Sequence, residues 1–412
     1  MASVKFLMPT YRGVLTFVGA ACIAYLCSYV SLVVSASYPG LRFLGRYVFV
    51  AGFLCIVLLS FERGFKLRKL PGYLPIFAFT IYYLIHCIYF ENGRFETHGQ
   101  SVFLVYFLAI SFWLLIRTEA DYLQMLLIIW IFLLVVLSYY IQLVADFGPV
   151  VSRITPEDMG LAVNGNVLCL MSTTFSILSL RIYETYLPGR VKRSVNRQRL
   201  EALGLSSISL ACLTFTFWHL NMTFTMVNLI ILGFIMHRYS SKSVKVGLLL
   251  LVFAVAVASI DFSYFDAPLV DQFNLYSERV ESGGSANHRL VSAIDVYNKW
   301  LMNPIFGAPQ HLVVQPVWGS SNHLFYLNIL AIYGVVGFIL FGTLILSLIL
   351  PGVRSMSSGQ MLARVLFLTI WMVGPSTYPQ AICLLIMLPR EFYSNSNSRF
   401  RTGVKSVPLD QS

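Results

Sequence analysis

The sequence predicts an all-α, multi-pass membrane protein, and three observations support this class: composition, repeated apolar runs and the placement of basic residues. Of the 412 residues, 57% are hydrophobic and 11% are charged, and the mean hydropathy is +0.73. A soluble chain of this length carries about 25% charged residues. Too few polar side chains are present to cover a water-facing globule, so lipid is expected around much of the chain.

Apolar runs recur along the chain at close to the length of about 20 residues that crosses a bilayer as a helix. The first run follows Lys5 and Arg12 and is too long for the core of a signal peptide, so we expect an uncleaved span. About twelve transmembrane helices are predicted, at 13–36, 43–60, 72–90, 101–116, 122–145, 164–182, 205–218, 222–236, 244–260, 323–349, 361–375 and 378–389.

Basic residues are distributed very unevenly between the two sides of the membrane in this layout. Only seven of the 29 fall on one side, which leaves 22 on the side that holds both termini. The seven are Arg42, Arg46, Arg94, Arg153, Arg279, Arg289 and Lys299. Basic residues collect in cytoplasmic loops, so both termini are expected in the cytoplasm. The same bias accounts for the net charge of +11 and leaves no need for a nucleic-acid partner.

The seven cysteines all fall inside or at the edge of apolar runs and show no metal-ligand spacing. They are Cys22, Cys27, Cys55, Cys87, Cys169, Cys212 and Cys383. This pattern argues against a disulfide framework and a structural zinc site, and it favours buried thiols that pack as small apolar groups. We expect no metal and no cofactor.

One loop, from Asp261 to Asn322, is far longer than the others and lies on the non-cytoplasmic side of the layout. The chain therefore divides into nine helices with short loops at 1–260, the large loop at 261–322, three helices at 323–390 and a cytoplasmic tail at 391–412. Connections longer than about 15 residues usually carry a function or are disordered. The loop is rich in aromatic residues and is not of low complexity, which favours an ordered, functional segment.

Within this loop, apolar residues recur with helical spacing at Leu290, Ile294, Tyr297 and Leu301. Proline and glycine follow directly and end the pattern. The spacing predicts an amphipathic helix that lies on the membrane domain and does not cross it.

Arg289 falls in the first turn of this expected helix, where the helix dipole disfavours a cation. An anion should therefore hold it. Two partners are open: the phosphate of a ligand, or an acidic neighbour such as Glu278, Glu281 or Asp295.

Charged residues are almost absent from the interiors of the expected spans. Ion-coupled transporters usually place such residues near the middle of the membrane. His86 is the main exception, and we interpret it as a core histidine. The pattern favours a reaction at the outer leaflet over transport through the middle.

Two segments carry a resemblance to a known family. The segment from His323 to Gly337 reads HLFYLNILAIYGVVG, with the histidine at the membrane boundary and Gly334 and Gly337 deeper in the span. Upstream, Arg289-Leu is followed by Asn303-Pro-Ile-Phe-Gly307. In order and spacing these segments resemble the signatures of the O-antigen ligase and O-antigen polymerase superfamily. The resemblance covers about residues 285–340 and implies a fold similar to the GT-C class of glycosyltransferases.

The resemblance implies a bacterial inner-membrane enzyme whose large loop is periplasmic. The donor would be a glycan on undecaprenyl pyrophosphate, and transfer would be metal-independent and inverting. Partners would be the lipid bilayer and a chain-length regulator or flippase of the same pathway. His323 is then the expected base and Arg289 the expected phosphate ligand. Further binding candidates for the pyrophosphate and glycan are Arg279, Arg153, His288, His219 and Tyr326.

The residue types suit this chemistry. Without a metal, charge that develops on pyrophosphate must be met by fixed cations, and arginine contacts phosphate oxygens in a bidentate manner. Histidine titrates in the range useful for accepting a proton from an attacking hydroxyl. His288 is the second choice for that role.

Three departures from the family pattern bear on the activity. Leu324 follows the histidine where many members carry asparagine, and Ala308 follows Gly307 where many carry a Gly-x-Gly. A Ser-Arg near the outer end of an earlier span is replaced by Trp218-His219, so His219 would have to supply the cation.

Because the Ser-Arg element is missing and the spans are rich in Phe, Tyr and Ile, we favour a polymerase that joins repeat units. A ligase that transfers the glycan to lipid A–core is the alternative. A flippase or other transporter of lipid-linked glycans is a third.

Overall fold

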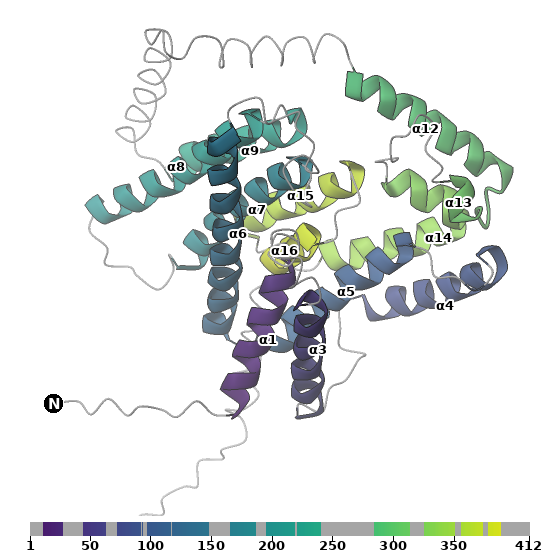
Figure 1. The fold of residues 1–412 in the computed structure, drawn as a ribbon, viewed down its shortest axis with the longest axis horizontal. Helices are drawn as coiled ribbons and strands as arrows, with labels where there is room; N and C mark the ends of the chain where they lie inside the picture. Colours follow the sequence, from purple (N-terminus) through teal and green to yellow (C-terminus); the bar gives the residue numbers. More distant parts are fainter. Residues whose placement is uncertain are drawn as a thin grey trace, which may run out of the picture.

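The computed structural model describes residues 11–27, 44–62, 72–91, 93, 97–116, 118–147, 165–186, 195–218, 221–239, 284–313, 325–350, 356–373 and 378–388. Within these ranges the chain forms helices and no strand (Figure 1). The helices are α1 (Tyr11–Cys27), α3 (Leu44–Glu62), α4 (Tyr73–Phe90), α5 (Thr97–Leu115), α6 (Glu119–Phe147), α7 (Gly165–Tyr186), α8 (Val195–Trp218), α9 (Met222–Arg238), α12 (Gly284–Met302), α13 (Gln310–Val313), α14 (Phe325–Ile349), α15 (Ser358–Val373) and α16 (Tyr378–Met387).

The predicted apolar runs correspond to these helices, except for 244–260, which lies outside the described residues. Five helices among the described residues are long and apolar enough to cross a membrane: α4, α6, α7, α8 and α14. Shorter apolar helices occur within α1, α9 and α15. The prediction of an all-α, multi-pass membrane protein is confirmed at this level, and the count of twelve spans stays a prediction.

Hydroxyl side chains join the helices around α7, which is the most buried of the five long apolar helices. Ser176 Oγ lies 2.9 Å from Ser209 Oγ of α8. Asn228 of α9 donates from Nδ2 to Thr173 Oγ1 at 2.9 Å and lies 3.3 Å from Thr216 Oγ1. Such hydrogen bonds hold apolar helices together where no water competes for them.

Helices α4 and α14 form an antiparallel pair, as Figure 1 shows. Near the start of α4, a Cβ added to Gly72 would approach Ser347 close to the end of α14. Farther along, the Phe79 ring packs on those of Tyr333 and Phe341, with centroids 5.6 and 6.4 Å apart. This aromatic packing sets the distance between the two helices.

The helix expected in the large loop is present as α12, but the face that it turns towards the protein differs from the expected one. Val296 is buried and Trp300 half-buried, whereas Ile294, Tyr297 and Leu301 of the predicted stripe are exposed. α12 packs on α14 and α13. The apolar stripe therefore points away from the described part of the protein.

Two basic residues that were counted on the side of the termini lie inside helices, within the predicted spans 164–182 and 361–375. Arg181 belongs to α7 and Arg364 to α15, and both are buried. Hydropathy placed both residues in helices but could not reveal that they are buried. The partners that make the burial of Arg181 possible come from other helices.

Candidate functional site

Helix α14 is broken at Gly334, whose φ of 64° and ψ of −170° are not helical. In an unbroken helix the Val335 N–H would donate to the Ala331 carbonyl. It donates instead to Pro304 O at 2.9 Å, and Ala331 O accepts from the Ala308 N–H at 3.0 Å. A turn after α12 has thus replaced part of the hydrogen-bond ladder of α14.

We call this contact between residues 303–308 and residues 331–336 the loop–helix joint. It includes a third backbone bond, from the Val336 N–H to Ile305 O at 3.3 Å. The turn is also bonded internally, because Gly307 N donates to Asn303 O at 2.9 Å and Trp300 Nε1 to Pro304 O at 3.1 Å. The polar backbone of the joint is therefore largely satisfied without water.

Glycine is required on both sides of the joint. Gly307 and Gly334 have φ values of 81° and 64°, in the left-handed region that favours glycine. A Cβ on Gly307 would overlap the Ile332 carbonyl, and one on Gly334 would overlap the Ile305 carbonyl. Both are backbone atoms that cannot turn aside, so only glycine allows this approach.

Tyr82 of α4 closes the joint from the other side. Its hydroxyl lies 2.7 Å from Tyr333 O and 3.1 Å from Phe306 O, and its single hydrogen can satisfy either carbonyl. Its ring also faces Gly337, where an added Cβ would lie 2.9 Å from Cε1. The Tyr82 hydroxyl therefore reaches one carbonyl of the turn and one carbonyl next to the break in α14.

Ion pairs and hydrogen bonds line the rim next to the joint. The Glu91 carboxylate, at the end of α4, accepts a hydrogen bond from the Gln310 N–H and lies 3.9 Å from His311 Nδ1. Lys299 of α12 pairs with Asp295 at 2.7 Å and reaches the Val313 carbonyl at 3.4 Å. These contacts tie α12 and α13 to the end of α4.

His86 is buried, as the sequence indicated, but among the described residues it is not the hydrogen-bonded core histidine that we expected. Its ring packs against those of Phe90 and Tyr333, with centroids 4.8 and 4.9 Å apart. The ring nitrogens make no hydrogen bond of normal geometry within the described part of the chain. The Ile332 backbone is close enough to interact with the ring, but without that geometry. His86 thus supports the joint from within the aromatic packing.

The structure locates only some of the predicted site residues. Tyr326 is in the first turn of α14, half-buried, with its ring 6.2 Å from that of Phe341. This packing gives it a structural role that does not depend on sugar binding. His323, Arg279, Arg153 and His219 lie outside the described residues.

Residues 288 and 289 belong to α12, with their side chains outside the described set. Position 289 precedes the buried Val296 by seven residues, which is two helical turns. It therefore lies on the face of α12 that packs on α14. In the sequence, position 323 is two residues before the start of α14, so the joint connects the helix of Arg289 to the helix that follows His323.

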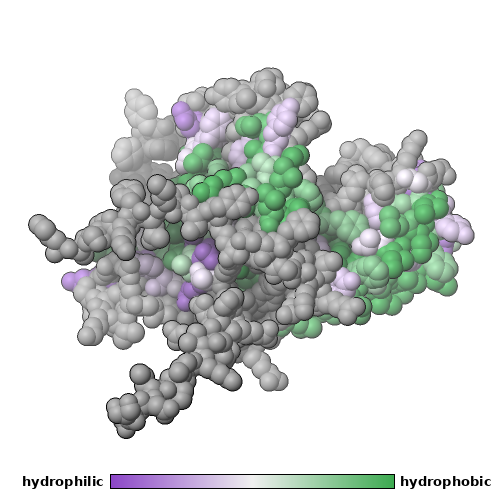
Figure 2. Space-filling view, turned by 90° about the horizontal axis from the view of Figure 1, so that it is seen from below, coloured by the Kyte–Doolittle hydropathy of each residue, from purple (hydrophilic) through white to green (hydrophobic). Residues whose placement is uncertain are grey.

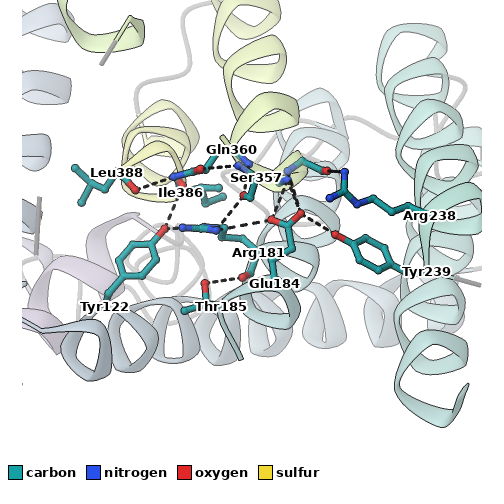
Figure 3. A network of polar contacts seen from close by, with 12 residues as sticks. Tyr122, Arg181, Glu184, Thr185, Arg238, Tyr239, Ser357, Gln360, Ile386 and Leu388 are labelled. Atoms are coloured by element: carbon teal, nitrogen blue, oxygen red, sulfur yellow. Dashed lines mark hydrogen bonds and ion pairs between the residues drawn. The ribbon is translucent and has the colours of Figure 1, made fainter. Parts of the chain in front are cut away.

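A second polar cluster, shown in Figure 3, joins α6, α7, α9, α15 and α16, and sequence reasoning missed it. We call it the polar clamp. Arg181 donates from NH1 to Ser357 Oγ at 2.9 Å and from Nε to Tyr122 Oη at 3.2 Å. The Tyr122 hydroxyl lies 3.1 Å from the carbonyls of Leu385 and Ile386. One arginine thus links four helices.

The other half of the polar clamp is Glu184, whose side chain is 6% exposed. Its carboxylate accepts from the Ser358 N–H at 3.0 Å and from the Gly359 N–H, so it caps the first turn of α15. It also accepts from the Tyr239 hydroxyl at 3.0 Å. Burial and this carboxylate raise the pKa of Tyr239, which keeps the phenol protonated as the donor.

Glu184→Gln should destabilise the protein, because glutamine offers one acceptor oxygen where the α15 cap uses two, and because the change removes the carboxylate that lies 3.8 Å from Arg181. Hydrogen bonds to charged groups contribute about 1.5–3 kcal/mol. We expect a lower melting temperature in detergent, measured by size-exclusion chromatography after heating. The exposed Glu119→Gln is the control and should change little. Equal stability of the two variants would contradict a structural role for the polar clamp.

The described part of the chain is that of an all-helical, multi-pass membrane protein. Its long apolar helices are joined by hydroxyl contacts, and the turn after α12 is hydrogen-bonded into the break in α14. A scan against protein-family models and searches of curated proteins and of solved structures found no match. The activity therefore has to be argued from the loop–helix joint and the residues around it.

Proposed function

We propose that the protein is a glycosyltransferase that acts at the periplasmic face of the inner membrane. It takes its donor glycan from undecaprenyl pyrophosphate and polymerises repeat units of O-antigen or a related surface polysaccharide. The loop–helix joint is the observation that supports this proposal. It brings together the two segments, Asn303–Gly307 and the span after His323, that resemble the O-antigen ligase and polymerase superfamily. Their backbones are bonded directly to each other.

In this reaction the acceptor hydroxyl oxygen attacks the anomeric carbon of the donor and its proton passes to His323. The bond between the anomeric carbon and the pyrophosphate oxygen breaks on the opposite face, so the configuration inverts. Undecaprenyl pyrophosphate leaves with the bonding electrons. Arg289, with Arg279 and Arg153, neutralises the charge on its phosphate oxygens. Of the acidic alternatives for Arg289, Asp295 already pairs with Lys299, and Glu278 and Glu281 lie outside the described residues.

Arg289→Lys should lower the rate of transfer while leaving the amount of membrane-inserted protein unchanged. Lysine keeps the charge but cannot make the bidentate contact with a phosphate. A loss of about 1.5–3 kcal/mol corresponds to roughly tenfold to hundredfold slower transfer. Product formation from purified lipid-linked repeat units measures it. Wild-type kinetics would favour an ion pair with an acidic neighbour.

Transfer should persist in excess EDTA, because fixed arginines and not a bound cation neutralise the leaving group in this mechanism. The measurement compares product formation by purified protein before and after dialysis against the chelator. Loss of activity that Mg²⁺ or Mn²⁺ restores would contradict the metal-independent mechanism.

The surface glycan of a deletion strain separates the polymerase from its alternatives. One repeat unit on lipid A–core supports a polymerase. Bare core with glycan accumulated on the polyprenyl carrier would indicate a ligase. Lipid-linked glycan retained on the cytoplasmic face would indicate a flippase and would contradict transferase activity.

A further inference from the structure

The turn that follows α12 exposes apolar side chains while its backbone is bonded within the protein. Met302, Ile305 and Phe306 are 83%, 56% and 54% exposed. Turns that face water are usually built from polar residues and glycine. Most carbonyls of this turn are instead hydrogen-bonded through the loop–helix joint or within the turn, which a non-helical segment needs at membrane depth.

The joint lies well inside the length of the two helices that it contacts. Gly334 is nine residues from the start of α14, which is about 13 Å along the helix axis. On the antiparallel partner, Tyr82 is eight residues before the end of α4, or about 12 Å. Two helices long enough to cross a membrane therefore hold the turn at the same depth below their ends. The chain then returns to Gln310, which bonds Glu91 at the end of α4.

α12 carries an exposed apolar stripe that leads to this turn. Ile294, Tyr297 and Leu301 are 53%, 49% and 51% exposed and recur on one face of the helix, while Val296 on the opposite face is 1% exposed. Asp295 and Lys299 pair with each other beside this stripe. The charges beside the stripe are thus neutralised locally, and Asn298 is the one exposed polar residue between Ile294 and Leu301 on the stripe itself.

The stripe and the turn lie beside exposed apolar faces of the long helices. On α4 these faces include Ile85 and Ile88, and on α14 Val335 and Ile339. α12 packs on α14, which packs on α4. Figure 2, seen from below, shows many hydrophobic residues on the lobe at its right, on the side where α4 lies. The surface is therefore continuous with faces that meet lipid if α4 and α14 cross the membrane.

We infer that α12 and the turn at Asn303–Gly307 form a re-entrant element, with the stripe of Val291, Ile294, Tyr297 and Leu301 against the acyl chains of the leaflet that surrounds the first half of α14. The element enters the bilayer along α12, reverses at Pro304–Gly307 and leaves towards Gln310. Lipid is the occupant that fits the apolar side chains, and the bonded carbonyls of Asn303, Pro304, Ile305 and Phe306 lower the cost of placing this turn in a bilayer. Water would leave a contiguous apolar surface unfavourably hydrated.

Nitroxide spin labels on single cysteines at positions 294 and 301 test this inference in the full-length protein reconstituted into phospholipid vesicles, with the native cysteines replaced. Molecular oxygen concentrates in the bilayer and a water-soluble nickel chelate is excluded from it. The ratio of oxygen to nickel accessibility should exceed that of the control position 311 severalfold, and it should be higher at 301 than at 294. The side chain of His311 is 65% exposed beyond the end of α4, so it should meet water.

High nickel accessibility at 294 and 301 would show that the stripe faces water and would overturn the inference. Low accessibility to both reagents would show that protein covers the stripe, from this chain or a second copy, and would overturn it as well. The measurement uses no substrate, so it holds whether or not the protein transfers glycans.

Discussion

Gly334→Ala should abolish glycan transfer and strongly destabilise the protein. The backbone conformation at this position, φ 64° and ψ −170°, is essentially restricted to glycine and costs other residues about 1–3 kcal/mol. The added methyl group would also overlap the Ile305 carbonyl, which is backbone and cannot rotate away. Relief of this overlap requires the turn to leave α14, which breaks the bonds of Val335 and Val336 to the turn.

Gly342→Ala on the same helix is the matched control. No atom lies within 4 Å of a Cβ built there, and alanine is favoured over glycine within a helix by about 1 kcal/mol. This variant should be as stable as the wild type or slightly more so. Melting temperature in detergent and transfer rate measure both variants. Similar behaviour of Gly334→Ala and Gly342→Ala would contradict the loop–helix joint.

His323→Ala should eliminate transfer without changing the amount or the melting temperature of the protein in the membrane. In the proposed mechanism this histidine accepts the proton of the attacking hydroxyl at the start of α14. A general base contributes about 10²–10⁴-fold to a rate. Single-turnover assays with purified lipid-linked donor measure the loss.

His237→Ala is the control for this variant, because His237 is an exposed histidine in the last turn of α9. It should retain the wild-type rate. Full activity of His323→Ala would remove His323 from the mechanism and leave His288 as the base to examine next.

The two variants address different properties. Gly334 belongs to the backbone connection that positions α12 against α14, so its replacement should lower stability and activity together. His323 belongs to the proposed chemistry, so its replacement should lower activity alone. A matching loss of stability in His323→Ala would indicate a structural role for the histidine.

Much of the fold could be predicted from hydropathy alone. The run at 72–90 became α4 at 73–90, and the run at 323–349 became α14 at 325–349. Pro304 and Gly307 correctly indicated where the loop helix ends, since α12 stops at Met302. These features are local, because apolar length and helix-ending residues act on the segment that contains them.

The site was predicted less completely. The sequence indicated Asn303–Gly307 and the span with Gly334, but not that they meet through backbone hydrogen bonds, because in the sequence these glycines look like a helix end and a helix-packing position. The polar clamp was missed for a related reason. Arg181 and Glu184 look like loop charges at the end of a span, and only Ser357, Ser358 and Tyr122 make them buried partners.

By itself the sequence determined the all-helical membrane class, the position of most helices and the amphipathic character of α12, since each follows from the order of apolar and polar residues along a few turns. Only the tertiary structure decided which face of α12 packs on α14 and why Gly307 and Gly334 must both be glycine. Those outcomes depend on the approach of two backbones 27 residues apart in the chain, where carbonyls of one segment replace the missing helix bonds of the other.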